Sequence, residues 1–248
     1  MEVEQLTNCI ANRLHLSGDQ NRIDELLESI KGEESVIDFN RIIPMPESLN
    51  IESGSRTNNG LKTYKDFVAV YTMDGTLEKD LLNIPKESEE NFLKMRSDID
   101  HDTWELGRTA FQNEQKYGAA DWYQFHNEFW GSKWDAWDSF LSEDNTIEFY
   151  TAWSRVMPIV QKLAENYPDI KFEYSWADED LGCNVGSAEL ENGQVVHDEF
   201  LTPQSKEAFE LACELWGDEC LEVMGLVFNE KLGTYEYHDE PNESPQMS

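Results

Sequence analysis

The chain has 248 residues, 39% of them hydrophobic and 12% aromatic, which is enough for a folded core in one large domain or two small ones. It carries 51 acidic side chains against 19 basic ones, a formal net charge of −32. Such a field repels phosphate backbones and attracts basic surfaces. The composition therefore argues against direct binding of DNA or RNA, or of a membrane, and favours a basic protein partner.

The cysteines and the chain ends place further limits on the class of protein. Cys9, Cys183, Cys213 and Cys220 form no CxxC pair and no zinc-ligand spacing, so we expect buried free thiols, with no metal and no cofactor. No basic segment followed by an apolar one opens the chain, and no apolar run approaches about 18 residues. A cytoplasmic protein is the expectation.

The first elements of the chain predict a β-α-β unit. Alternating apolar residues indicate a strand over Asn8–Leu16. The helix Asp19–Lys31 follows, and its apolar residues recur with helical spacing. These residues are Ile23, Leu26, Leu27 and Ile30. A second strand is predicted over Ser35–Ile43, ended by Pro44, which cannot continue a strand ladder.

The region up to Trp130 reads as a loop followed by a helical insertion. Glu47–Gly60 is polar and contains glycine, as expected of a loop. Residues 61–130 show helical periodicity, which predicts several helices. One short helix lies around Leu77–Leu82, one is capped by Ser88, and one covers Asp102–Tyr117 and ends at Gly118.

The stretch Asp121–Trp153 holds five of the eight tryptophans. Its first half places aromatic residues on one helical face, and Gly131 follows at the position where a left-handed residue ends a helix. These aromatic residues are Trp122, Phe125, Phe129 and Trp130. A well-filled core is one interpretation of this density, and an aromatic binding surface is the other.

A second β-α-β unit follows. Period-two alternation predicts strands over Thr146–Trp153 and Ile170–Trp176, and Pro158 marks the start of a helix between them. Two such units predict an α+β fold with a ferredoxin-like split β-α-β sheet and its helices on one face. We expect this domain to cover residues 1–201.

The C-terminal part predicts an acidic α/β extension over residues 202–238. The domain itself ends in a hairpin around Asn192-Gly193. A helix starts near Thr202-Pro203 and ends at Gly217, and strands over Leu221–Asn229 and Thr234–His238 are expected to pair. Residues 239–248 read as a disordered tail.

Motifs of known chemistry are absent from the sequence: there is no HExxH, GxSxG, P-loop or GxGxxG. Asp178-Glu179-Asp180 is dense in acid but lacks the spacing of a calcium loop, so a solvated turn is the expectation. Between Trp130, Trp134 and Trp137, the charged pair Lys133 and Asp135 forms either a small polar site or a salt bridge that packs the loop.

Several segments together resemble one family, the YubB-like ferredoxin-fold proteins. The segments are Asn8-Cys9, Asn12–Gly18, Phe39-Asn40, Ile43–Pro46, Trp130–Ala136 and Thr151–Ser154. The similarity covers roughly residues 5–200 in the right order. The chain departs from the family where Glu4-Gln5-Leu6-Thr7 replaces the opening Met-Pro-Asn-Trp. The resemblance implies a ferredoxin-like fold and carriage by plasmids, phages or pathogenicity islands, and it transfers no catalytic residue.

Charge and resemblance lead to one functional expectation. Glu207, Glu210 and Glu214 share a helix face by their spacing, and spaced carboxylates imitate phosphates. We expect a non-enzymatic interaction protein of a phage or mobile element. Its expected partner-binding residues are Asp178, Glu179, Asp180, Glu207, Glu210 and Glu214, with Trp130, Lys133, Trp134, Asp135 and Trp137 of the tryptophan-rich segment. It would inhibit a host nucleic-acid-binding defence enzyme, of CRISPR or restriction type, by occupying its basic groove. A metal-dependent hydrolase using clustered carboxylates and a small-ligand binder at Trp130–Trp137 are the alternatives.

Overall fold

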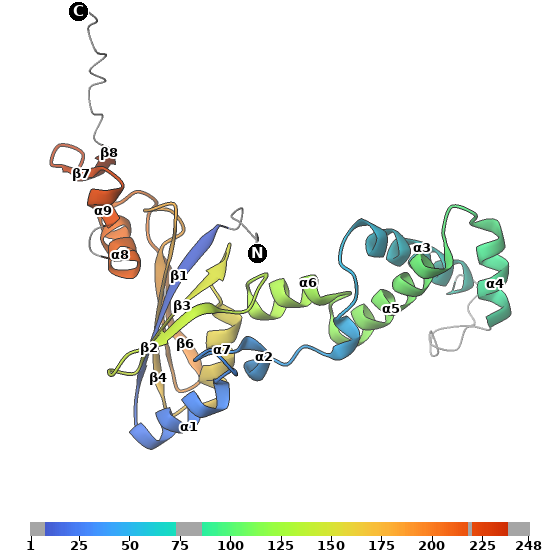
Figure 1. Cartoon of the computed structure of the whole chain (residues 1–248), viewed down its shortest axis with the longest axis horizontal. Coiled ribbons are helices and arrows are strands. Elements are labelled where there is room, and N and C mark those ends of the chain that lie inside the picture. Colours follow the sequence, from blue (N-terminus) through green and yellow to red (C-terminus); the bar gives the residue numbers. More distant parts are fainter. Residues whose placement is uncertain (1–7, 73–85, 218–219, 238–248) are drawn as a thin grey trace, which may run out of the picture. The chain divides into compact units, whose positions relative to one another are not determined.

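The computed structural model describes residues 8–72, 86–217 and 220–237 (Figure 1). The chain divides into two compact units. The first combines Met1–Ile43 with Trp130–Ser248, and the second is Pro44–Phe129. No helix in the described ranges is long and apolar enough to cross a membrane.

A six-stranded antiparallel sheet organises the first unit, with the strand order β2-β3-β1-β4-β5-β6. The strands are β1 (Cys9–Ser17), β2 (Trp137–Leu141), β3 (Thr146–Ala152), β4 (Lys171–Asp178), β5 (Gly186–Glu191) and β6 (Gln194–Phe200). The first four strands form the split β-α-β arrangement of a ferredoxin-like fold, which confirms the predicted class. The β5–β6 hairpin extends the sheet beside β4.

Helices α1 (Gln20–Ile30) and α7 (Met157–Asn166) cover one face of this sheet. The side chain of Asp19 caps α1 by accepting the N–H groups of Asn21 and Arg22. The buried residues of sheet and helices meet in one core, as predicted. They include Ile10, Leu14, Ile23, Leu26, Ile147, Phe149, Leu163, Phe172 and Tyr174. Leu27, expected among them, is only partly buried.

The predicted strand over Ser35–Ile43 is wrong. This segment contains the short helix α2 (Phe39–Ile42), capped by the carboxylate of Asp38. Ile37 and Phe39 are both buried and alternate as in a strand, but Phe39 and Ile42 lie three residues apart, as on one helix face. The second strand of the fold is β2, which follows the helical unit in the sequence.

Strand β2 was missed because its pattern is broken. Its register against β3 shifts between Trp137 and Phe140, and Asp138 has a φ of 47°. This β-bulge removes the regular alternation from which a strand is read. Its side chains are also only half-buried or exposed.

The second unit is helical, but it begins earlier than the expected insertion. It contains η1 (Glu47–Leu49), α3 (Ser55–Thr72), α4 (Lys86–Met95), α5 (His101–Tyr117), α6 (Trp122–Phe125) and the π-helical turn η2 (His126–Trp130) except for its last residue. The loop predicted over Glu47–Gly60 therefore holds only for residues 50–54, because η1 and the start of α3 occupy its two ends. Ser88 lies inside α4 rather than at its start, whereas Gly118 ends α5 with a φ of 78°, as predicted. The helix predicted around Leu77–Leu82 lies outside the described residues.

Close backbone contact joins α3 and α5. A Cβ on Gly60 would lie 2.2 Å from the carbonyl oxygen of Thr103 and 2.9 Å from the nitrogen of Gly107. Both glycines are thus required where the helices cross. Tyr64 and Phe67 pack around Trp104 with ring centroids 5.0 and 5.3 Å away, which forms the aromatic core of this unit.

The C-terminal extension consists of α8 (Lys206–Trp216), α9 (Cys220–Val223) and the hairpin β7 (Leu226–Asn229) and β8 (Thr234–Tyr237). These elements gather at one end of the sheet (Figure 1). Arg13 donates to the carbonyl oxygen of Glu214, and Tyr150 stacks on Trp216 at 5.4 Å. Arg13 and Tyr150 alternate with core residues, so α8 covers the face opposite α1 and α7. The expectation of helices on one face only is corrected.

The cysteines also differ from the prediction. Cys213 and Cys220 form a disulfide that joins α8 to α9, and the free cysteines Cys9 and Cys183 are half-buried. Burial raises the pKa of both free thiols, and nearby carboxyl groups raise it further. The two free cysteines are therefore poor nucleophiles. The tail over residues 239–248 lies outside the described residues.

Candidate partner-binding surface

Helix α8 presents three carboxylates on its outer side. Ser205 caps it by accepting the N–H of Ala208, and its apolar face is buried against the sheet. Glu207, Glu210 and Glu214 are all exposed, as their spacing predicted. At a rise of about 1.5 Å per residue, they follow one another at roughly 4.5 and 6 Å along the axis. Lys206 lies 3.4 Å from Glu210, and their side chains are half-exposed.

The sheet face beside α8 carries five further glutamates. Residues paired across antiparallel strands point to the same side, and Arg13 is paired with Glu148 on β3 and with Ser175 on β4. Ser175 pairs with Ser187 on β5, and Ser187 pairs with Glu199 on β6, so the same face continues across these two strands. Its acidic residues are Glu148, Glu173, Glu189, Glu191 and Glu199. Together with Glu207, Glu210 and Glu214 we call them the acidic face.

Two cations lie within the sheet part of the acidic face. Lys171 Nζ lies 3.1 Å from Glu173, 3.0 Å from Glu189 and 3.5 Å from Glu191. Hydrogen bonds to the carboxylates of Glu189 and Glu173 raise the pKa of Lys171. Arg13 binds Glu148 at 2.9 Å. Because a few cations each contact several partners, they fix the positions of the carboxylates while the surface keeps an excess of negative charge.

Strand geometry sets the spacing of these charges. Carboxylates two residues apart on a strand, such as Glu189 and Glu191, recur about 6.6 Å apart, and neighbouring strands lie about 4.8 Å apart. A rigid sheet thus holds negative charges at intervals of the same order as those along a nucleic-acid backbone. The alternation of Lys171 and Glu173 with the buried Phe172 and Tyr174 was the available sequence signal, but pairing across strands was needed to assemble the surface.

The acidic turn at the end of β4 has two different parts. Asp178 is buried and accepts hydrogen bonds from Asn8 Nδ2 at 2.7 Å, the Asp180 N–H at 2.9 Å and Asn184 Nδ2 at 3.4 Å. Its carboxylate therefore holds the turn and is not available to a partner. Glu179 and Asp180 are exposed and remain candidates for partner contact.

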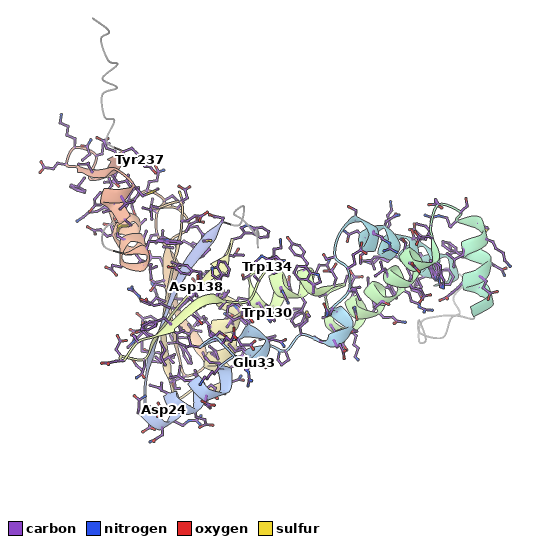
Figure 2. The ribbon with its side chains drawn as sticks, viewed as in Figure 1. Asp24, Glu33, Trp130, Trp134, Asp138 and Tyr237 are labelled. Atoms are coloured by element: carbon purple, nitrogen blue, oxygen red, sulfur yellow. A yellow bond between two sulfur atoms is a disulfide. The ribbon has the colours of Figure 1, made fainter. Side chains whose placement is uncertain are left out.

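The side chains of the tryptophan-rich segment Trp130–Trp137 lie in different surroundings and do not form a single polar site. Trp130 and Trp134 are labelled in Figure 2. Trp130 is buried and donates its Nε1–H to the carbonyl oxygen of Ile43 at 2.9 Å. The ammonium of Lys133 lies 4.6 Å from the ring of Trp134 and 5.0 Å from that of Trp153. Both rings are partly exposed, at 42% and 38%. Trp137 belongs to β2, opposite Tyr150.

Asp135 belongs to the interior of the same segment. Its carboxylate accepts the backbone N–H groups of Phe39 at 2.9 Å and Ala136 at 2.7 Å. Burial raises the pKa of Asp135 to about 6; these two N–H groups act against that rise, and the carboxyl of Asp38 adds to it. Asp135 thus ties the α2 loop to the segment before β2.

The described residues contain no candidate metal-binding site. Within residues 8–72, 86–217 and 220–237, no three His, Cys, Asp or Glu side chains group as metal ligands would. Three glutamates of the acidic face, Glu173, Glu189 and Glu191, converge on the ammonium of Lys171, and the other five are spread over strands and a helix.

Part of the chain matches a known family model. Residues 129–219 match the family model described as "Ferredoxin-like domain in Api92-like protein". The match covers β2 to α8 and includes all eight glutamates of the acidic face, five on the sheet and three on α8. The description of this ferredoxin-like domain states a fold and names no activity.

One solved structure is similar over most of its length. It is the crystal structure of a protein api92 from Yersinia pseudotuberculosis, with 12% sequence identity and a TM-score of 0.41. The similarity covers 79% of this chain and 98% of that chain. The curated proteins gave no match.

Proposed function

We propose that this protein is a non-enzymatic interaction protein whose acidic face binds a basic, nucleic-acid-binding surface of another protein in place of the nucleic acid. The observation that carries the proposal is the fixed array of carboxylates on α8 and on the sheet face beside it. A net charge of −32 adds a long-range attraction for a basic partner.

The physical basis is that the charges are held in place before binding. Side chains on a paired sheet lose little freedom when a partner arrives, so less conformational entropy opposes association. Charge complementarity also accelerates the encounter and excludes acidic partners. A target that evolved to hold phosphates presents lysines and arginines at matching intervals.

The class of target follows from the resemblance noted in the sequence. The YubB-like proteins are carried by plasmids, phages and pathogenicity islands, and a mobile element benefits from blocking host enzymes that act on nucleic acid. We infer that the target is a host defence enzyme of the CRISPR or restriction type, bound in the host cytoplasm. The hydrolase alternative has no metal-binding group within the described residues to support it.

A small-ligand site at the tryptophan-rich segment is the second candidate function. The exposed rings of Trp134 and Trp153 on either side of Lys133 favour it, since such rings stack on planar ligands. If this site carries the function, Trp134→Ala abolishes ligand binding, while replacing Glu207, Glu210 and Glu214 by lysine leaves ligand binding unchanged.

The test is capture of partners from host lysate at low salt by the wild-type protein and by two triple variants. The first variant places lysine at Glu207, Glu210 and Glu214. The control places lysine at Glu28, Glu33 and Glu34, which are exposed but lie on or after α1, away from the acidic face.

Wild type and control should retain the same basic protein, and added duplex DNA should release it. The first variant should lose it. Equal retention by both variants would contradict the proposal, because the two variants change the net charge equally.

A further inference from the structure

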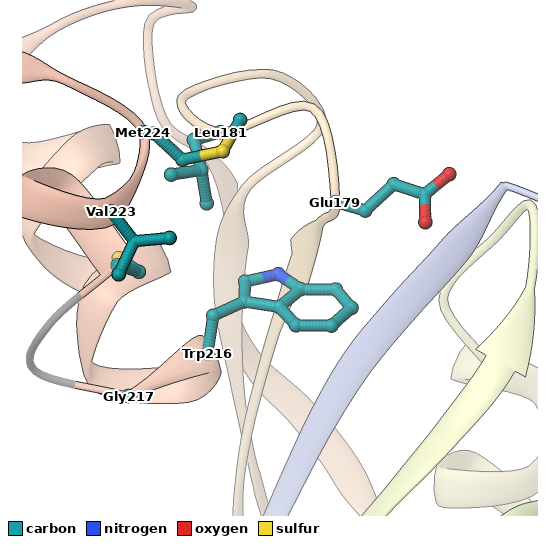
Figure 3. Close-up of a pocket in the computed structure, with 7 residues that line it drawn as sticks. Glu179, Leu181, Trp216, Gly217, Val223 and Met224 are labelled. Carbon is teal, nitrogen blue, oxygen red and sulfur yellow. The ribbon is translucent and has the colours of Figure 1, made fainter.

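An apolar hollow lies at the edge of the acidic face, between the end of α8 and the turn after β4 (Figure 3). It has a volume of about 510 Å³. Its lining residues are Glu179, Leu181, Trp216, Gly217, Cys220, Val223 and Met224. A hollow of this size accepts one or two large side chains.

The walls of the hollow are fixed by the surrounding structure. Trp216 donates its Nε1–H to the carbonyl oxygens of Ala177 at 3.2 Å and Asp178 at 3.0 Å, so the polar edge of the indole is satisfied and the ring forms an apolar wall. The disulfide between Cys213 and Cys220 holds α9 against α8. The hollow is therefore formed before any partner binds.

Two of the described residues at its opening are exposed apolar side chains. Val223 is 77% exposed and Met224 is 44% exposed, and both flank the opening (Figure 3). Solvent exposure of these side chains is unfavourable, and covering them on binding would stabilise a complex. Among the described lining residues Glu179 is the one that carries a charge, and it lies on the side opposite Val223 (Figure 3).

We propose that this hollow receives a large aliphatic or aromatic side chain of the protein partner, next to a lysine or arginine that contacts Glu179. The inference rests on the proposed function, because Trp216 belongs to the helix that carries Glu207, Glu210 and Glu214. It adds that the partner is recognised by an apolar anchor beside its basic surface. Duplex DNA, whose bases are stacked inside the helix, offers no such side chain.

Charge complementarity selects this occupant over a second copy of the chain. Two chains of net charge −32 repel each other, whereas a basic partner is attracted by Glu179 and by the acidic face. Interfaces commonly combine a charged periphery with one or two buried apolar anchors, which contribute much of the binding energy. Here the acidic face is the charged periphery, and the hollow is the site for the apolar anchor.

Three small probes test the hollow in the full-length protein. Phenylalaninamide supplies an aromatic side chain and a cation, glycinamide supplies the cation alone, and N-acetylphenylalaninamide supplies the ring alone. Binding is followed by NMR on the indole N–H of Trp216, assigned with the variant Trp216→Phe. Phenylalaninamide should bind at least tenfold more tightly than glycinamide. Glu179→Gln should weaken the binding of phenylalaninamide but not that of N-acetylphenylalaninamide.

Matched variants show whether the lining residues are responsible. Val223→Asn and Met224→Gln should each lower the affinity for phenylalaninamide by threefold or more. Val227→Asn should not, since Val227 is also half-exposed, at 50%, but lies outside the hollow. Equal binding of phenylalaninamide and glycinamide, or an equal effect of Val223→Asn and Val227→Asn, overturns the inference.

Binding of polylysine separates this inference from the proposed function. If Glu207, Glu210 and Glu214 bind polylysine in a salt-dependent way but the hollow takes no aromatic probe, only the inference fails. If the hollow takes phenylalaninamide but lysine at these three positions leaves polylysine binding unchanged, the proposed function fails, and with it the assignment of a basic partner to the hollow.

Discussion

Replacement of Asp135 by asparagine should remove a pH-dependent cost of folding. The carboxylate of Asp135 is partly buried beside Asp38, which raises its pKa from 3.8 to about 6. A carboxyl group whose pKa is higher in the folded state binds its proton more tightly there. It therefore destabilises the fold above pH 6, and this cost fades as the pH falls through 6 towards 4.

The size of the effect follows from the shift. A difference between 3.8 and about 6 corresponds to at most about 3 kcal/mol of unfolding free energy at neutral pH. About 2 kcal/mol of this unfolding free energy is regained when the pH is lowered from 7.5 to 4.5, because the carboxyl becomes protonated in the folded state while it is still mostly ionised in the unfolded state. Asparagine keeps an oxygen that can accept the N–H groups of Phe39 and Ala136 but carries no charge.

Urea denaturation of the wild type and Asp135→Asn at a series of pH values measures this directly. The stability of the variant relative to the wild type should fall by about 2 kcal/mol from pH 7.5 to 4.5. Taking the difference removes the general effect of protonating other acids. Asp138→Asn serves as control for the loss of one charge, since Asp138 is exposed. A relative stability of Asp135→Asn that is constant with pH would refute the reasoning.

Three further predictions concern stability and covalent structure. Leu26→Ala should lower the unfolding free energy by about 2–5 kcal/mol and Leu27→Ala clearly less, because Leu26 is 0% exposed and Leu27 is partly exposed; equal losses in urea denaturation would contradict this. Gly131→Ala should cost about 1–3 kcal/mol, more than Gly225→Ala, because both have positive φ but only at Gly131 would a Cβ lie 2.9 Å from a carbonyl oxygen, that of Arg155. Thiol titration of denatured, unreduced protein should detect Cys9 and Cys183 only, and detection of all four cysteines would disprove the Cys213–Cys220 disulfide.

The elements that were predicted well are those with a strong local pattern. β3, α7 and β4 show clean periods of two and 3.6 because each has one fully buried side. The hairpin between β5 and β6 turns at Asn192 and Gly193, whose φ values of 53° and 75° suit the Asn-Gly pair. In these cases the residues near each position determine its conformation.

The features that were missed depend on contacts between distant residues. β2 is a short, bulged strand whose identity comes from pairing with β3, and α2 carries a pattern that fits either a strand or a helix. The disulfide depends on how α8 packs against α9. The acidic face was anticipated on α8 alone, because its strand glutamates come together only when the order β3-β1-β4-β5-β6 is known.

Competition with nucleic acid is the most direct test of the central claim. A captured partner, loaded with fluorescent duplex DNA, is titrated with the protein at ionic strengths between about 50 and 500 mM, across which the screening length falls from above to below about 8 Å. The protein should displace the DNA stoichiometrically, with an association rate that decreases steeply as salt rises. A partner that keeps its DNA while the protein is bound, or binding that does not respond to salt, would contradict the account.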